Sequence, residues 1–270
     1  MGRLDQYYTN PRIAAEFLRI TKSYLRGNHI AVGTWIEPSA GTGAFFNLLP
    51  VNRLGFDLDP KAPGVERADF LTLKELPPNS VTIGNPPFGK NASLAVRFFN
   101  HSAQFSEVIA MILPRTFRKS SLRNRLDCHF ELAAEYEVAP DAFIYEAQPY
   151  DVPCVFQIWQ RCAKLRAKTV EQRSSRWFSF TSPTQSNCIV QRIGANAGKL
   201  KSPQSQPSPN SHYFLDASSE VKQILGEMWE MGGYDGIKYN TAGNPSIAKT
   251  ELVRLLDEFM AQDALGERAA

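Results

Sequence analysis

The feature that most constrains the fold is a repeated alternation of short apolar segments with helix-like segments, up to about residue 160. The apolar segments are typical of buried strands, and we expect them over residues 33–37, 53–57, 66–71, 80–84, 108–113, 131–138 and 155–160. Helices are expected over residues 11–26, 44–49, 92–105 and 120–127, the first of them opened by Asn10-Pro11. This order predicts an α/β fold with a mostly parallel, seven-stranded sheet.

The character of the sequence changes after about Arg161, so we place a domain boundary between residues 162 and 163. The segment 163–270 contains two short β-like runs, at 177–180 and 188–193, and two amphipathic stretches, at 218–231 and 245–260. We expect the last stretch to be a helix that starts at Asn244-Pro245. Residues 200–211 are rich in Ser, Pro and Gln and cannot build a core. The second part is therefore predicted to be a small α+β region.

Composition excludes several classes of protein. No apolar run approaches the roughly 20 residues that a membrane span needs, and the N-terminal segment lacks the apolar stretch of a signal peptide. We therefore expect no membrane partner and a cytoplasmic location, in a bacterial, archaeal or virus-infected cell. The four cysteines are widely spaced without a Cys-x-x-Cys pair, which argues against a zinc site or a disulfide framework. No metal is expected.

Four polar side chains stand at or just after the ends of expected strands: Glu37, Asp57, Asp69 and Asn85. In parallel sheets, ligands bind beyond these carboxyl ends. Between the first two acids, Gly41 and Gly43 form a turn where a ligand can approach the backbone. The third glycine of the dinucleotide fingerprint is missing, because Phe46 occupies its place, which counts against a pyrophosphate ligand.

A nucleoside fits the remaining pattern. Asp57 is suited to accept hydrogen bonds from both ribose hydroxyls. Asp69 offers an acceptor for an exocyclic amine, and Phe70 offers a ring for a purine to lie against. The pattern therefore predicts a nucleoside ligand at the edge of the sheet.

These motifs together resemble the S-adenosylmethionine-dependent amino-methyltransferases, most closely those that methylate N6 of adenine in DNA. The resemblance covers about residues 4–160 and rests on Tyr8-Thr-Asn-Pro11, Glu37-Pro-Ser-Ala-Gly-Thr-Gly43, Asp57-Leu-Asp-Pro60, Asp69-Phe70 and Asn85-Pro-Pro-Phe88. It implies a Rossmann-like methyltransferase fold with S-adenosyl-L-methionine as cofactor. The implied cofactor-binding residues are Thr9, Glu37, Ser39, Gly41, Gly43, Asp57, Asp69 and Phe70.

By the same resemblance, Asn-Pro-Pro-Phe is the catalytic motif. The side-chain oxygen of Asn85 and the carbonyl of Pro86 would accept both hydrogens of an exocyclic amine, and Phe88 would stack on the target base. Such a base must leave its duplex or already be single-stranded. The chain from Pro86 to Pro87 is rigid, because proline fixes φ, so the carbonyl would be held in place.

The expected partner is nucleic acid, and the resemblance favours DNA. From residue 115 to residue 201 the chain carries 14 Lys and Arg against 8 Asp and Glu. The candidates for phosphate contacts are Arg115, Arg118, Lys119, Arg123 and Arg125. The segment 163–270 would contain the target-recognition part.

Three alternatives remain open on the sequence: an RNA methyltransferase acting on adenine N6 or guanine N2, a protein glutamine methyltransferase, and an inactive nucleic-acid-binding relative. The sequence does not give the oligomeric state.

Overall fold

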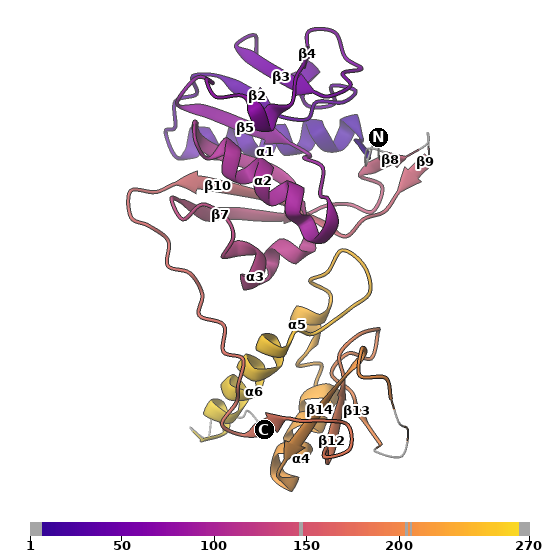
Figure 1. Ribbon diagram of the computed structural model, residues 1–270. Helices are drawn as coiled ribbons and strands as arrows, with labels where there is room; N and C mark the ends of the chain where they lie inside the picture. The colour runs from indigo at the N-terminus through magenta and orange to yellow at the C-terminus, as the bar shows by residue number, and fades with distance from the viewer. Residues whose placement is uncertain (1–6, 146–147, 203–204, 206, 265–270) are drawn as a thin grey trace. The chain divides into compact units, whose positions relative to one another are not determined.

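The computed structural model describes residues 7–145, 148–202, 205 and 207–264, and the chain divides into two compact units, up to Thr169 and from Val170 onward (Figure 1). The boundary drawn from the sequence, after residue 162, lies just past the last strand of the first unit. Each unit has its own hydrophobic core and is described by itself.

The first unit is built on a seven-stranded sheet with the order β4-β3-β2-β5-β6-β10-β7. The strands are β2 (Trp35–Glu37), β3 (Arg53–Asp57), β4 (Glu66–Arg67), β5 (Ser80–Gly84), β6 (Ser106–Pro114), β7 (Phe130–Glu137) and β10 (Cys154–Arg161). Only β10 runs in the opposite direction to the other strands of this sheet, so the predicted mostly parallel, Rossmann-like α/β fold is confirmed. The strand order reverses between β2 and β5, which is where such sheets bind ligands.

Helices cover both faces of the sheet (Figure 1). Successive side chains of a strand point to opposite faces, so Val108, Ala110 and Ile112 of β6 pack in the core that includes α1 (Pro11–Gly27). The alternate residues of β6 pack with α2 (Ser93–Ser102). Helix α1 begins as predicted, with Asn10 accepting a hydrogen bond from the backbone N–H of Arg12 at 3.0 Å.

Several expected elements of the first unit are shorter than predicted. The helix expected over residues 44–49 is a turn followed by a 3₁₀ helix, η1 (Phe46–Leu48), because Pro50 leaves room for little more than one helical turn after the glycine loop. The strand expected over residues 66–71 ends at Arg67. Asp69 then caps a second 3₁₀ helix, η2 (Phe70–Thr72), by accepting from the N–H of Leu71 at 3.0 Å. The helix expected over residues 120–127 ends at Arg123, as α3 (Ser120–Arg123).

A small antiparallel sheet was not expected. It contains β1 (Tyr8–Thr9), β8 (Phe143–Tyr145) and β9 (Gln148–Tyr150), in the order β1-β8-β9. Figure 1 shows β8 and β9 as a hairpin beside the N-terminal end of α1. This sheet ties the N-terminal segment to a part of the chain more than 130 residues later.

The second unit is a four-stranded antiparallel sheet, in the order β11-β14-β12-β13, with helices packed on it. Its elements are β11 (Phe178–Phe180), β12 (Cys188–Gln191), β13 (Leu200–Lys201), β14 (His212–Ala217), α4 (Ser219–Glu230), α5 (Asp235–Lys238) and α6 (Lys249–Ala264). The small α+β region is thus confirmed, although β13 and β14 were missed.

The start of the last helix was predicted wrongly. Helix α6 begins at Lys249 rather than at Pro245. The carbonyl of Pro245 accepts from the N–H of Gly194 at 2.8 Å, and Ser246 forms a β-bridge with Ile193, so this segment is extended along the end of β12. Among the described residues, no helix is both long and apolar enough to cross a membrane.

Candidate active site

A cavity of about 380 Å³ opens at the carboxyl ends of β2, β3 and β5, which is within the size range of small-molecule sites. Eight residues singled out from the sequence line it: Ser39, Gly41, Asp57, Asp69, Phe70, Asn85, Pro86 and Phe88. Three others, Thr9, Glu37 and Gly43, are not part of its wall. The wall also includes residues that were not assigned a binding role from the sequence: Tyr7, Tyr8, Pro38, Leu58, Asp59, Ala68, Leu71, Pro87, Leu94, Arg97 and Phe98.

The two glycines of the loop have different structural roles. Gly41 has a φ of +48° and lines the cavity, and a Cβ there would lie 3.0 Å from the ring of Tyr8. Gly43 has a φ of +79°, and a Cβ there would lie 2.7 Å from the Cβ of Ala62, inside the loop. The missing Cβ of Gly41 thus makes room for the ring of Tyr8 in the cavity wall, while that of Gly43 allows the loop to pack.

Asp57 connects the end of β3 to the glycine loop. Its Oδ2 accepts a hydrogen bond from the N–H of Gly41 at 2.7 Å, and its Oδ1 accepts from the N–H of Asp59 at 2.8 Å. An ionised carboxylate can accept about four hydrogen bonds. Asp57 therefore shapes the loop and keeps acceptor capacity on the cavity side.

Asn85 has the most unusual environment in the cavity. Its Nδ2 donates to the backbone carbonyl of Tyr7 at 3.2 Å, which turns Oδ1 away from Tyr7. Within the described part of the chain, Oδ1 is buried without a hydrogen-bond partner. The backbone carbonyl of Asn85 is occupied, since it accepts from the hydroxyl of Ser39 at 3.0 Å. A buried acceptor without a partner costs about 1–3 kcal/mol, so this oxygen is prepared for a ligand donor.

Phe88 is half-buried in the cavity wall and packs against the cores on both faces of the sheet. Its carbonyl accepts from the N–H groups of Leu94 and Ala95, at 3.1 and 3.3 Å, which fixes it to the start of α2. Between these points, Asn91 and Ala92 have left-handed φ values of 52° and 57°. Strained backbone of this kind occurs at ligand sites, where the surrounding structure holds it in place.

Glu37 lies below the cavity rather than in its wall, with 2% of its surface exposed. Burial raises the pKa of Glu37 well above its ordinary value, and the neighbouring carboxylate of Asp57 raises it further. The backbone N–H groups of Phe46 and Phe45 offset part of this effect. Glu37 is therefore protonated at a higher pH than an exposed glutamate.

Asp69 and Phe70 are neighbours in the chain but differ in exposure. Asp69 is exposed, and its Oδ1 accepts from Leu71 as the cap of η2. The ring of Phe70 is 1% exposed and stacks on Phe98, with centroids 5.7 Å apart. The sequence predicted that Phe70 offers a face to a purine, but the ring is mostly core. Leu58, which is 53% exposed and directly follows Asp57, supplies open apolar surface in the wall.

Thr9 is buried in β1, opposite Phe143 of β8, so it is not placed against the cavity. The preceding Tyr7 and Tyr8 line the cavity instead. The sequence motif therefore lies next to the site, but the side chains that reach the cavity are the aromatic ones. Alternation along an extended segment puts Tyr8 on the opposite face to Thr9 and could have indicated Tyr8, but it puts Tyr7 on the same face as Thr9 and gives no signal for Tyr7.

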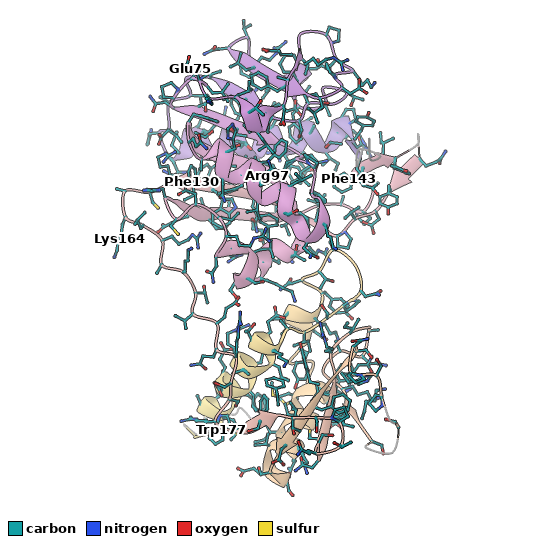
Figure 2. All side chains as sticks on the ribbon, in the orientation of Figure 1. Glu75, Arg97, Phe130, Phe143, Lys164 and Trp177 are labelled. Atoms are coloured by element: carbon teal, nitrogen blue, oxygen red, sulfur yellow. The ribbon has the colours of Figure 1, made fainter. Side chains whose placement is uncertain are left out.

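The basic residues expected to hold phosphates are largely engaged within the protein. Two carboxylates of β7, Glu135 and Glu137, form ion pairs with Arg115, Arg118 and Arg123, at 2.6–3.8 Å. Arg125 donates to the carbonyl of Asn91 at 3.4 Å, and Lys119 also has a partner. These two carboxylates offset part of the local positive charge, and phosphate binding by this group stays a prediction. Arg97 of α2 is a cation in the cavity wall itself (Figure 2).

The cysteines are free thiols, two buried and two partly exposed. In the described parts of the chain, no three His, Cys, Asp or Glu side chains come together as a metal site would require.

No family model matches this chain, and no curated protein does. Several solved structures are similar over part of the chain. A proposed RNA methyltransferase from Pyrococcus horikoshii is 17% identical, with a TM-score of 0.46, over 59% of this chain and 88% of its own.

Two further solved structures give lower scores. A proposed class I S-adenosylmethionine-dependent methyltransferase from Listeria monocytogenes is 12% identical, with a TM-score of 0.42, over 57% of this chain and 63% of its own. A 23S rRNA methyltransferase is 17% identical, with a TM-score of 0.40, over 61% of this chain and 73% of its own. At these values we take nothing about the substrate from the three proteins.

Proposed function

We propose that this protein transfers a methyl group from S-adenosylmethionine to the exocyclic N6 amine of adenine in DNA. The observation that carries the proposal is the Oδ1 of Asn85, a buried acceptor without a partner among the described residues, in the wall of a cavity that also contains Asp57. Acceptors for an amine and for a ribose thus share one cavity of suitable size.

The residues of the cavity fit the nucleoside part of this cofactor. Gly41 lines the cavity, and Asp57 beside it has acceptor capacity for ribose hydroxyls. Asp69 is exposed at the same wall and would accept from an exocyclic amine of a purine. When bound, S-adenosylmethionine supplies an electrophilic methyl group on a sulfonium.

The contribution of the protein to the chemistry would be orientation. An adenine amine is a weak nucleophile, because its lone pair is delocalised into the ring. Asn85 Oδ1 and the carbonyl of Pro86 would accept its two hydrogens and turn the lone pair out of the ring plane. Asn85 is a neutral amide, so it orients the amine instead of removing its proton. Holding two reactants in line can lower a barrier by about 7–11 kcal/mol.

Phe88 would lie against the target base, in the manner of other proteins that bind unstacked bases. Its half-exposed ring in the cavity wall, fixed by the start of α2, supports this role. Phe70 is less suited to hold a base, because its ring is buried. We therefore infer that Leu58 and Leu71 contribute the apolar contacts to the cofactor adenine.

The preference for DNA over RNA rests on the Tyr-Tyr-Thr-x-Pro element at residues 7–11, by resemblance. The second unit, from residue 170 onward, is the candidate target-recognition part. Its modest size is consistent with a short recognition sequence.

The experiment is to incubate the protein with cofactor that carries a radiolabelled methyl group and with duplex DNA, single-stranded DNA, RNA or protein in turn. The proposal is supported if the DNA becomes labelled and the label is recovered as N6-methyladenine after digestion. Label that enters only RNA or only protein contradicts the DNA assignment, and no label in any polymer contradicts the activity. The Asn85→Ala variant is the matched background control.

A further inference from the structure

Three tyrosines form a cluster beside the cavity. Tyr7 stacks on Tyr150, with ring centroids 4.9 Å apart and planes 25° apart, and lies 5.1 Å from Tyr145. The rings of Tyr145 and Tyr150 are 5.8 Å apart, so all three touch. The residues come from two distant parts of the chain, the segment before β1 and the hairpin β8–β9. We call this group the tyrosine cluster.

The tyrosine cluster is continuous with the candidate active site. Tyr7 lines the cavity, and its carbonyl accepts the hydrogen bond from Asn85. The base of the hairpin is anchored, because Phe143 at the start of β8 is buried in the core (Figure 2). The outer end is open, since Tyr150 is 41% exposed. A surface of aromatic rings thus leads from Asn85 to solvent.

The outer tyrosines are not explained by core packing. Among the described residues, Tyr145 and Tyr150 belong to no hydrophobic core, whereas Tyr7 packs against the core of α1. An exposed aromatic ring next to a cavity is a common feature of binding surfaces. The cluster is therefore better explained by a ligand than by stability.

The chemistry of the hairpin selects the kind of ligand. Its described residues, 143–145 and 148–150, carry no charge, so they suit the face of a base rather than a phosphate. Pro149 has no N–H, which makes the outer edge of β9 a poor place for a peptide strand to pair. A base within a duplex has both faces covered by its neighbours, so the ring of Tyr150 fits a base that is unpaired.

We propose that Tyr150 stacks on the base next to the target adenine in an unpaired strand, while the target itself enters the cavity at Asn85. The inference rests on the proposed function in taking a nucleic acid as the substrate and adenine as its target. It makes single-stranded or locally opened nucleic acid the form that the protein binds. Tyr7 and Tyr145 support the ring of Tyr150 from the protein side.

The test is a coupling measurement between Tyr150 and a single base. The probe is a fluorescein-labelled strand of thymidines with one central deoxyadenosine, compared with strands in which the nucleotide before or after the adenosine is abasic. Binding is followed by fluorescence anisotropy without cofactor, for the wild type, Tyr150→Ala and Tyr150→Phe. Stacking of one base on an aromatic ring corresponds to roughly a 5- to 150-fold change in Kd.

We expect one abasic strand to bind the wild type about tenfold more weakly than the intact strand does. Tyr150→Ala should weaken binding of the intact strand by a similar factor and show no further loss on the abasic strand. Tyr150→Phe should behave like the wild type. Three results would each overturn the inference. The wild type binds all strands equally, Tyr150→Ala loses the same affinity on every strand, or the wild type binds none of the strands.

Because only binding is measured, the two proposals fail separately. If binding shows coupling between Tyr150 and one base but no methyl transfer is found, the proposed function is contradicted and the stacking surface is still supported. Transfer without coupling would contradict the stacking surface alone. The intact and abasic strands can be compared with the wild type alone. The melting temperature of Tyr150→Ala shows whether that variant is folded.

Discussion

The side chain of Asn85 donates a hydrogen bond of 3.2 Å to the backbone carbonyl of Tyr7, 78 residues earlier in the chain. This bond fixes which end of the amide faces the cavity, because a carbonyl accepts only from the NH₂ group. The Oδ1 is left as a buried acceptor. The small sheet that holds the segment around Tyr7 therefore determines the orientation of the candidate catalytic group.

Replacement of Gly41 by alanine should destabilise the protein through its left-handed backbone. With φ at +48° and the ring of Tyr8 3.0 Å from the new Cβ, we expect a loss of roughly 1–2 kcal/mol. Gly27→Ala is the matched control, because nothing lies within 4 Å of that position, at the end of α1. Thermal unfolding should show a lower melting temperature for Gly41→Ala only. Equal melting temperatures would contradict the account of the loop.

Loss of the Asp57 carboxylate should weaken the binding of S-adenosylmethionine. It should have less effect on the rate of methyl transfer at saturating cofactor. Hydrogen bonds to a charged group contribute about 1.5–3 kcal/mol, so Asp57→Ala should raise the Kd of S-adenosylmethionine about 10- to 100-fold. Asp57→Asn keeps one side-chain acceptor, so its affinity for S-adenosylmethionine should fall by less than that of Asp57→Ala. Isothermal titration calorimetry measures both. A Kd for Asp57→Ala within about threefold of the wild type would show that the ribose is held elsewhere.

The raised pKa of Glu37 predicts a pH-dependent effect on stability. The folded protein keeps the proton that the unfolded chain releases near the ordinary value of 4.5, so this contribution is complete below that pH. It is lost as the pH rises toward the raised folded pKa. Glu37→Gln has no such titration, so its stability relative to the wild type should increase between about pH 5 and pH 8. Melting temperatures across that range give the comparison, and a constant difference would mean that Glu37 is not buried as described.

The four thiols should fall into two classes. Burial raises the pKa of Cys188 to about 11 and raises that of Cys154 as well, while Cys128 and Cys162 are partly exposed. Ellman's reagent should therefore react rapidly with Cys128 and Cys162 in the native protein. All of the thiols should react in denaturant. A denatured protein that leaves a pair unreacted would indicate a disulfide that the structure does not have.

The sheet and the centre of the site could be predicted because they depend on local patterns. Strand-like segments with polar ends place Asp57 and Asn85 at one edge, whichever loops join them. The tyrosine cluster could not be predicted in this way, since β1 forms only by pairing with β8, far along the chain.

In two places the structure differs from what the local sequence suggests, for the same physical reason. Arg118 reads as a free cation in the sequence, but β7 brings Glu135 and Glu137 beside it. Pro245 reads as the start of a helix, but pairing with the end of β12 keeps it extended. In both cases a distant segment outweighs the local signal.

The most direct test of the central claim compares methyl transfer and cofactor binding in Asn85→Ala. If Asn85 orients the amine, the single-turnover rate on the polymer that is labelled should fall by on the order of 10²–10³-fold or more. The Kd of S-adenosylmethionine should stay within about threefold of the wild type, because Asn85 is not needed for the ribose contacts of Asp57. Transfer at the wild-type rate by the folded variant would contradict the account.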